Sequence, residues 1–198
     1  MNKKLFSIVA LCLTATLSAY SVADYIREHG ERGLIYVNEL GTVIGDLSGK
    51  GLTSLEGLQE IGGIHKVSYL MLNGNKLEKL DVDSFTGLTN FKGIELCNNP
   101  LTDLGDSLRE LPNLTQLYLQ ENELCNLGKI LNSLKESTKL LVISLMDNPL
   151  QELGDDFSVL PNCELYLYGN RLSLGDRARL KKAYGWRYYD YAQRGGNL

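Results

Sequence analysis

Residues 114–124 read L-T-Q-L-Y-L-Q-E-N-E-L, an eleven-residue stretch with leucine at its first, fourth, sixth and last positions and asparagine at the ninth. The same spacing of apolar residues and asparagine recurs in residues 67–77, 91–101 and 140–150. Residues 165–172 match the pattern from its fourth position on. Because five copies keep one register, the sequence predicts an array of repeats that each form one structural unit.

Two features of each copy predict its local structure. A pair of apolar residues lies two positions apart, and this period of two directs both side chains to one face of a strand, which we expect to be the core. The asparagine that follows is expected to satisfy backbone groups at the turn where the strand ends, as a structural residue. The pairs are Leu70/Leu72, Ile94/Leu96, Leu117/Leu119, Ile143/Leu145 and Leu165/Leu167, and the asparagines are Asn75, Asn99, Asn122, Asn148 and Asn170.

These motifs resemble those of the leucine-rich repeat family over roughly residues 47–174. The resemblance implies an α/β solenoid, a horseshoe with short parallel β-strands on its concave face and loops or short helices on its convex face. Residues 44–174 are predicted to hold five clear repeats and one degenerate N-terminal repeat, in which Lys50 replaces the asparagine.

The two ends of such an array need caps, because terminal repeats otherwise expose the core. We predict an N-terminal cap over residues 24–43, with a short helix at 25–29 and a strand at 34–37. A C-terminal cap is predicted over residues 175–198, with a helix at 176–184 whose basic residues, Arg177 among them, face water. An aromatic group follows this helix: Trp186, Tyr188, Tyr189 and Tyr191. We favour a capping role for the group, with ligand binding as the alternative.

Residues 1–23 have the layout of a secretory signal peptide, with Lys3 and Lys4 before an apolar run and small residues up to Ala23. The run is shorter than the roughly 20 residues of a spanning helix. We therefore predict cleavage after Ala23, export to a secreted, periplasmic or cell-surface location, and no stable membrane span after cleavage. An uncleaved N-terminal anchor is the alternative.

Composition and motifs exclude several functions. The formal net charge is −4 and the pI about 5.3, so the chain lacks the positive field with which most nucleic-acid-binding proteins neutralise phosphates. The two histidines, His29 and His65, lie outside any metal or nucleophile motif. The sequence therefore predicts no catalytic residue, no metal, no cofactor and no nucleic-acid partner.

Acidic residues after the repeat cores have two interpretations, calcium ligands or helix N-caps. Examples are Asp155 with Asp156 and the Gly-Asp pairs at Gly105 and Gly175. Because no Asp-x-Asp-x-Asp-Gly loop accompanies them, we expect N-caps. Three cysteines follow the predicted signal peptide, Cys97, Cys125 and Cys163, and their spacing predicts no particular disulfide.

The residues between and beside the paired leucines should face the concave side in columns. Tyrosine and methionine are frequent there, and both are enriched at protein interfaces; strand propensity is the other explanation for the tyrosines. We expect a non-catalytic exported module that binds an unidentified protein through this face, or alternatively a structural or adhesive cell-envelope component that self-associates. The candidate binding residues are Tyr69, Met71, Glu95, Gln116, Tyr118, Gln120, Ser144, Met146, Tyr166 and Tyr168.

Overall fold

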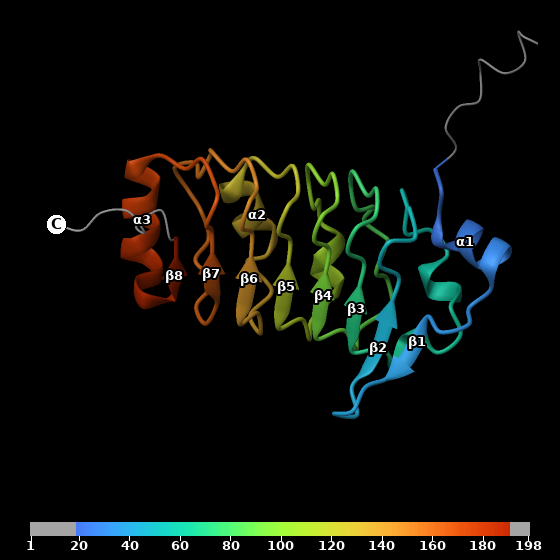
Figure 1. Cartoon of the computed structure of the whole chain (residues 1–198). Helices are drawn as coiled ribbons and strands as arrows, with labels where there is room; N and C mark the ends of the chain where they lie inside the picture. Colours follow the sequence, from blue (N-terminus) through green and yellow to red (C-terminus); the bar gives the residue numbers. More distant parts are fainter. Residues whose placement is uncertain (1–18, 191–198) are drawn as a thin grey trace, which may run out of the picture.

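The computed structural model describes residues 19–190, so most of the predicted signal peptide, as well as Tyr191, lies outside the described residues. One sheet of eight short strands runs the length of the molecule, with the strands in chain order (Figure 1). The first two strands are antiparallel, and every later strand is parallel to the one before it. The strands are β1 (Ile35–Val37), β2 (Val43–Asp46), β3 (Tyr69–Met71), β4 (Gly93–Glu95), β5 (Gln116–Tyr118), β6 (Val142–Ser144), β7 (Glu164–Tyr166) and β8 (Tyr188–Tyr189).

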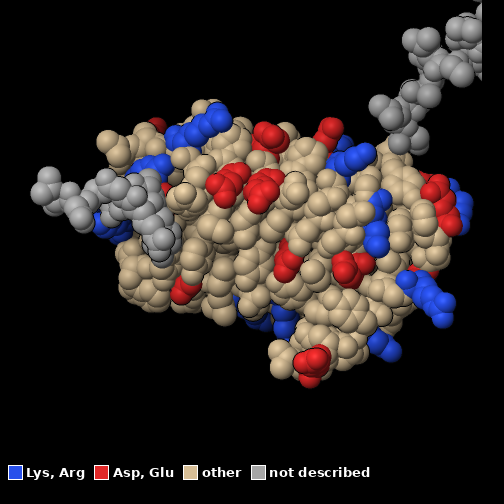
Figure 2. Space-filling model, viewed as in Figure 1, with Lys and Arg blue, Asp and Glu red and all other residues tan. Residues whose placement is uncertain are grey.

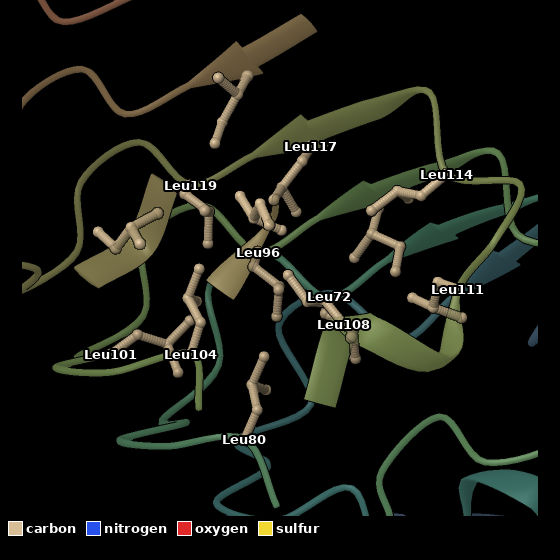
Figure 3. Close-up of a cluster of buried hydrophobic side chains, with 14 of the residues drawn as sticks. Leu72, Leu80, Leu96, Leu101, Leu104, Leu108, Leu111, Leu114, Leu117 and Leu119 are labelled. Atoms are coloured by element: carbon tan, nitrogen blue, oxygen red, sulfur yellow. The ribbon is translucent and has the colours of Figure 1, made fainter. Parts of the chain in front are cut away.

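The predicted solenoid is confirmed, and its core is the one that the paired apolar residues indicate. All ten side chains of the five pairs are fully buried, at 0% exposure. Figure 3 shows leucines of neighbouring repeats, such as Leu72, Leu96 and Leu119, packed between the strands and the loops opposite them. Complete burial of a leucine contributes about 1.5–3 kcal/mol, so this single cluster is the main source of stability.

The convex side is mostly irregular. It carries the 3-10 helices η1 (Leu58–Glu60), η2 (Ile64–Lys66) and η3 (Ser107–Glu110) and one α-helix, α2 (Leu127–Ser133). The α-helix occurs in the longest repeat, in which 26 residues separate Asn122 from Asn148. Asn126 caps it by accepting a hydrogen bond from the Lys129 N–H at 2.8 Å.

The prediction that aspartates of the Gly-Asp pairs act as N-caps is wrong at the two pairs that lie at the start of a helix. Asp106 stands at the N-cap of η3, yet its side chain makes no capping hydrogen bond. Helix α3 (Leu174–Tyr184) begins two residues before the predicted start because the Ser173 hydroxyl caps it, accepting from the Asp176 N–H at 3.0 Å. Asp176 is therefore the third helical residue and accepts a hydrogen bond from that hydroxyl in return.

The asparagines form a ladder along one edge of the sheet. The Asn122 side-chain amide donates to the carbonyls of Leu119, in its own repeat, and Leu96, in the preceding one, both at 3.0 Å. Its Oδ1 accepts from the Leu101 N–H at 3.2 Å. Bonds of the same kind, within and between repeats, are made by Asn75, Asn99, Asn148 and Asn170.

The N-terminal cap starts earlier than expected. Helix α1 (Val22–His29) has Ser21 as its N-cap, in a capping box with Asp24. Val22 is fully buried, and the Ala23 N–H donates to the Glu56 carbonyl at 3.0 Å. Cleavage after Ala23 stays a prediction, and it would remove these three residues from the cap.

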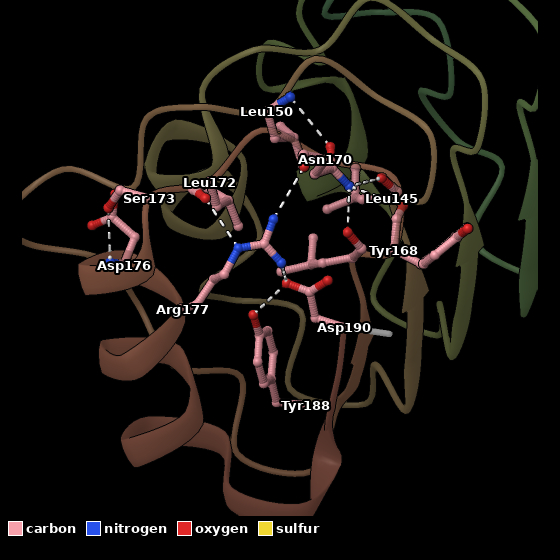
Figure 4. Close-up of polar contacts among 11 residues, drawn as sticks. Leu145, Leu150, Tyr168, Asn170, Leu172, Ser173, Asp176, Arg177, Tyr188 and Asp190 are labelled. Carbon is pink, nitrogen blue, oxygen red and sulfur yellow. Dashed lines mark hydrogen bonds and ion pairs between the residues drawn. The ribbon is translucent and has the colours of Figure 1, made fainter. Parts of the chain in front are cut away.

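The C-terminal cap consists of α3, the 3-10 helix η4 (Gly185–Arg187) and β8. Tyr184 is buried over the last repeat, and its hydroxyl accepts from the Leu160 N–H at 3.2 Å. Arg177, which we expected to face water, pairs with the nearly buried carboxylate of Asp190 and also donates to two backbone carbonyls (Figure 4). Trp186 is 75% exposed, so most of its side chain faces solvent.

Candidate protein-binding surface

Strand register sets the outward-facing residues in rows, which together form the concave surface. The middle row runs across seven strands, because each of its members is paired with the next. The row before it consists of Tyr69, Gly93, Gln116, Val142 and Glu164, and the row after it of Asn73, Cys97, Gln120, Met146 and Tyr168. The middle row is Asp46, Met71, Glu95, Tyr118, Ser144, Tyr166 and Tyr189.

All ten predicted binding residues lie in these rows, but they are not equally accessible. Eight are half-buried, and Tyr168 is 48% exposed. Ser144 is the exception to the expected exposure, with only 3% of its surface accessible. The register sets it between Tyr118 and Tyr166, whose much larger side chains flank it on both sides.

Hydrogen bonds fix the side chains of the N-terminal half of the concave surface. The Tyr69 hydroxyl donates to one carboxylate oxygen of Glu95 at 2.9 Å, and the Asn73 amide donates to the other. The Asn73 Oδ1 accepts from the Cys97 N–H at 2.8 Å, and the Cys97 thiol donates to the Gln120 Oε1 at 3.1 Å. These hydrogen bonds therefore fix the orientations of concave side chains from three neighbouring repeats.

Glycine is required at one position of this network. The Tyr69 ring lies over Gly93, and a Cβ at that residue would come within 2.2 Å of a ring carbon. The missing side chain thus lets the Tyr69 hydroxyl reach the next strand. Asn73 and Gly93 were not among the predicted binding residues, and their only signal in the sequence is their place in the repeat. Tyr189 was predicted as part of the C-terminal aromatic group, for which capping was favoured over binding.

The Tyr69 and Tyr118 hydroxyls have raised pKa values, so both stay protonated and can donate hydrogen bonds. Burial raises the pKa of Tyr69 well above its usual value, and the hydrogen bond to Glu95 and its charge raise it further. Burial, followed by the charge of Glu95, also raises the pKa of Tyr118. Burial raises the pKa of the Cys97 thiol as well, so this group is a neutral thiol at physiological pH.

The C-terminal half of the concave surface is aromatic. The rings of Tyr166 and Tyr189 stack with centroids 4.5 Å apart and planes 7° from parallel. The Tyr166 hydroxyl donates to a carboxylate oxygen of Glu164 at 2.7 Å. Stacking and hydrogen bonding together restrict the rotation of this ring, so a partner would meet a preformed aromatic surface.

Groups that could support other chemistry are sparse in the part of the chain that the structure describes. No three His, Cys, Asp or Glu side chains gather there as metal ligands. Nor does any helix between residues 19 and 190 have the length and apolarity needed to cross a membrane. Cys97, Cys125 and Cys163 are free, and burial raises the pKa of Cys163 to about 12.

Comparison with known proteins agrees with this architecture. The sequence pattern of the family described as leucine rich repeat matches residues 65–124. The chain is a leucine-rich repeat protein. This leucine-rich repeat protein is 30% identical to mouse epiphycan over 70 residues, which is 35% of its own length and only 22% of epiphycan's.

Two solved structures from Drosophila share the fold. One is a chain of the Drosophila melanogaster SNF/U2A' complex, with a TM-score of 0.54 and 30% identity, matched over 60% of this leucine-rich repeat protein and 66% of the solved chain. The other belongs to the Toll–Spatzle complex, with a TM-score of 0.55 and 25% identity, matched over 69% of this protein and 18% of the solved chain. Both similarities confirm the predicted horseshoe fold.

Proposed function

We propose that this leucine-rich repeat protein is an exported, non-catalytic module that recognises a partner protein through its concave surface. The observation that carries the proposal is the set of half-buried tyrosines, each held by neighbours: Tyr69 by Glu95, and Tyr166 by Glu164 and Tyr189. Leucine-rich repeat proteins commonly mediate protein–protein binding, and the two solved relatives come from protein complexes.

The physical advantage of this surface is preorganisation. Binding costs about 0.5–1.5 kcal/mol for each flexible side chain that it immobilises. Here hydrogen bonds and stacking have already restricted the tyrosines, so less of the interaction energy is lost on ordering them. A tyrosine ring also supplies apolar contact area together with a polar tip.

The test first identifies the partner and then locates its site. A protein that begins at Asp24 or at Ala19 serves as the bait, and bound proteins are identified by mass spectrometry. The affinity of the purified partner is then measured by titration calorimetry. Tyr118→Ala and Tyr166→Ala should each weaken binding by about 1–2 kcal/mol or more, as aromatic anchors do. Lys135→Ala, on the convex side, should leave affinity unchanged. Normal binding by both tyrosine variants, with loss in Lys135→Ala, would place the partner on the convex side instead.

Self-association is the second candidate, favoured by apolar side chains exposed at the two ends of the solenoid. Val37 and Leu40, at the β1–β2 hairpin, are 63% and 89% exposed, and Leu174 and Trp186 at the other end are 86% and 75% exposed. Sedimentation velocity over a range of concentrations separates the candidates. Concentration-dependent oligomers that Leu40→Ser abolishes would favour self-association.

A further inference from the structure

The charges on the concave surface all have one sign. Its strand rows hold Asp46, Glu95 and Glu164. The adjoining turns hold both signs, with Glu121 and Asp147 but also Lys76 and Arg171. None of the three rows contains a lysine or arginine. Figure 2 shows the face that carries the strands, with acidic side chains spread across it and basic ones mainly at its margins.

The carboxylates of the strand rows have no ion pair with a described residue. The six ion pairs between described residues all lie outside the rows, as in Lys129–Asp103 on the convex side. Glu95 and Glu164 instead accept hydrogen bonds from neutral donors, the tyrosine hydroxyls and an asparagine amide. Their orientation is fixed while their charge is left uncompensated.

One buried polar atom of the middle row has no hydrogen-bond partner among the described residues. The Ser144 hydroxyl oxygen has no hydrogen bond to any described atom, although the residue is only 3% exposed. Because Ile143 and Leu145 face the core, strand alternation directs Ser144 toward the concave side, between Tyr118 and Tyr166. A buried hydroxyl without a partner is unfavourable, and a donor from outside would remove that cost.

We infer that the partner presents arginine or lysine side chains to the concave surface, an inference that rests on the proposed function. Carboxylates held without counterions attract a cation at a distance and are not displaced from existing ion pairs when it binds. The faces of the tyrosine rings add cation–π attraction. An arginine or lysine N–H that enters beside Tyr118, whose hydroxyl has no hydrogen bond to a described residue, supplies the missing hydrogen bond to Ser144.

The test uses the full chain and two fluorescent 12-residue peptides, one alternating arginine with serine and the other glutamate with serine. Asp147→Asn with Glu164→Gln removes two concave charges. Both changes preserve shape: a glutamine oxygen still accepts from Tyr166, and asparagine tolerates the left-handed backbone at residue 147. Asp155→Asn with Glu136→Gln is the matched control, since it removes the same two charges from exposed positions on the convex side.

Fluorescence anisotropy at about 0.1 M ionic strength, where the Debye length is about 10 Å, should show binding of the arginine peptide only. The concave pair of substitutions should weaken that binding about tenfold, and the convex pair less than about twofold, since interactions beyond a Debye length are screened. Circular dichroism verifies that both variants are folded. Equal effects of the two pairs, or no binding of the arginine peptide, would overturn the inference.

The outcome is separable from that of the proposed function. If the peptide fails to distinguish the two pairs while Tyr118→Ala still loses the protein partner, the concave surface binds a partner of another charge. If the tyrosine variants retain the partner, the proposed function fails, and the inference about its charge fails with it.

Discussion

Each ladder asparagine uses its side chain to hydrogen-bond backbone groups at the end of a strand, where the sheet offers them no partner. Removing the Asn122 side chain would leave the carbonyls of Leu96 and Leu119 and the Leu101 N–H without those bonds in a buried site. Asn122→Ala should therefore lower the free energy of unfolding by about 1–3 kcal/mol. Gln120→Ala, two residues earlier, should cost well under about 1 kcal/mol because the bond it loses is to a weak thiol donor. Equal midpoints in urea for the two variants would contradict this role.

The residue before each ladder asparagine adopts a left-handed backbone. Glycine holds this position at Gly74 and Gly169, whereas Glu121 adopts it with φ 56°. A side chain at such a φ costs about 1–2 kcal/mol. Glycine avoids this cost but loses more backbone entropy on folding, which offsets part of the benefit. We expect Glu121→Gly to stabilise the protein by about 0.5 kcal/mol and Glu123→Gly to destabilise it, as measured by urea unfolding. The same sign for both would refute the explanation.

The reverse substitution, of Gly169 by a residue that has a Cβ, should destabilise the protein. At Gly169 a Cβ would lie 2.0 Å from the Asp147 Oδ1, and φ is 78°.

Helix α1 depends on residues at the end of the predicted signal peptide. A chain that begins at Asp24 lacks the Ser21 cap, worth about 1 kcal/mol, and the buried Val22, worth about 1.5–3 kcal/mol. We expect it to unfold at lower urea than a chain that begins at Ala19, and Ser21→Ala in the longer chain to show the smaller loss alone. Identical midpoints for both chain lengths would show that α1 does not stabilise the first repeat.

The C-terminal cap should weaken at alkaline pH. Burial raises the pKa of Tyr184 to about 12, above the value near 10 of an unfolded tyrosine. Between pH 10 and 12 the unfolded chain loses this proton while the folded one keeps it, so the contribution is complete below pH 10 and falls as the pH rises. Stability of the unsubstituted chain should drop in this window by about 2 kcal/mol more than that of Tyr184→Phe. Parallel pH profiles would contradict this.

One continuous core joins the two caps, running from Val22 through every repeat to Tyr184. Adjacent repeats share both buried leucines and ladder hydrogen bonds, so we expect the described part of the chain to unfold in one transition. Leu117→Ala should cost about 2–5 kcal/mol. Trp186, the single tryptophan, reports on the C-terminal cap, which strands β6 and β7 separate from Leu117.

The measurement is urea unfolding followed by both tryptophan fluorescence and far-ultraviolet circular dichroism. Both midpoints should shift together in Leu117→Ala. A fluorescence midpoint that stays in place while the dichroism midpoint falls would show that the cap and the repeats unfold separately.

Local spacing in the sequence was sufficient to predict the strands of the five clear repeats, the buried leucine pairs and the positions of the asparagines, but not β2 or β8. Side-chain alternation and the turn that follows depend on residues within one repeat, so every repeat carries the full signal. Composition also predicts no nucleic-acid partner, and this stays a prediction.

Contacts between segments decided the remainder. Ser144 is buried because tyrosines from the repeats on either side flank it, and Arg177 turns inward because the later strand brings Asp190 to it. Helix α1 includes Val22 because the first repeat offers that side chain a buried site. The sequence by itself determined which face each strand residue occupies, since that follows from local backbone geometry. Only the tertiary structure decided how exposed that face is and which hydrogen bonds hold its side chains, because both depend on neighbours from adjacent repeats.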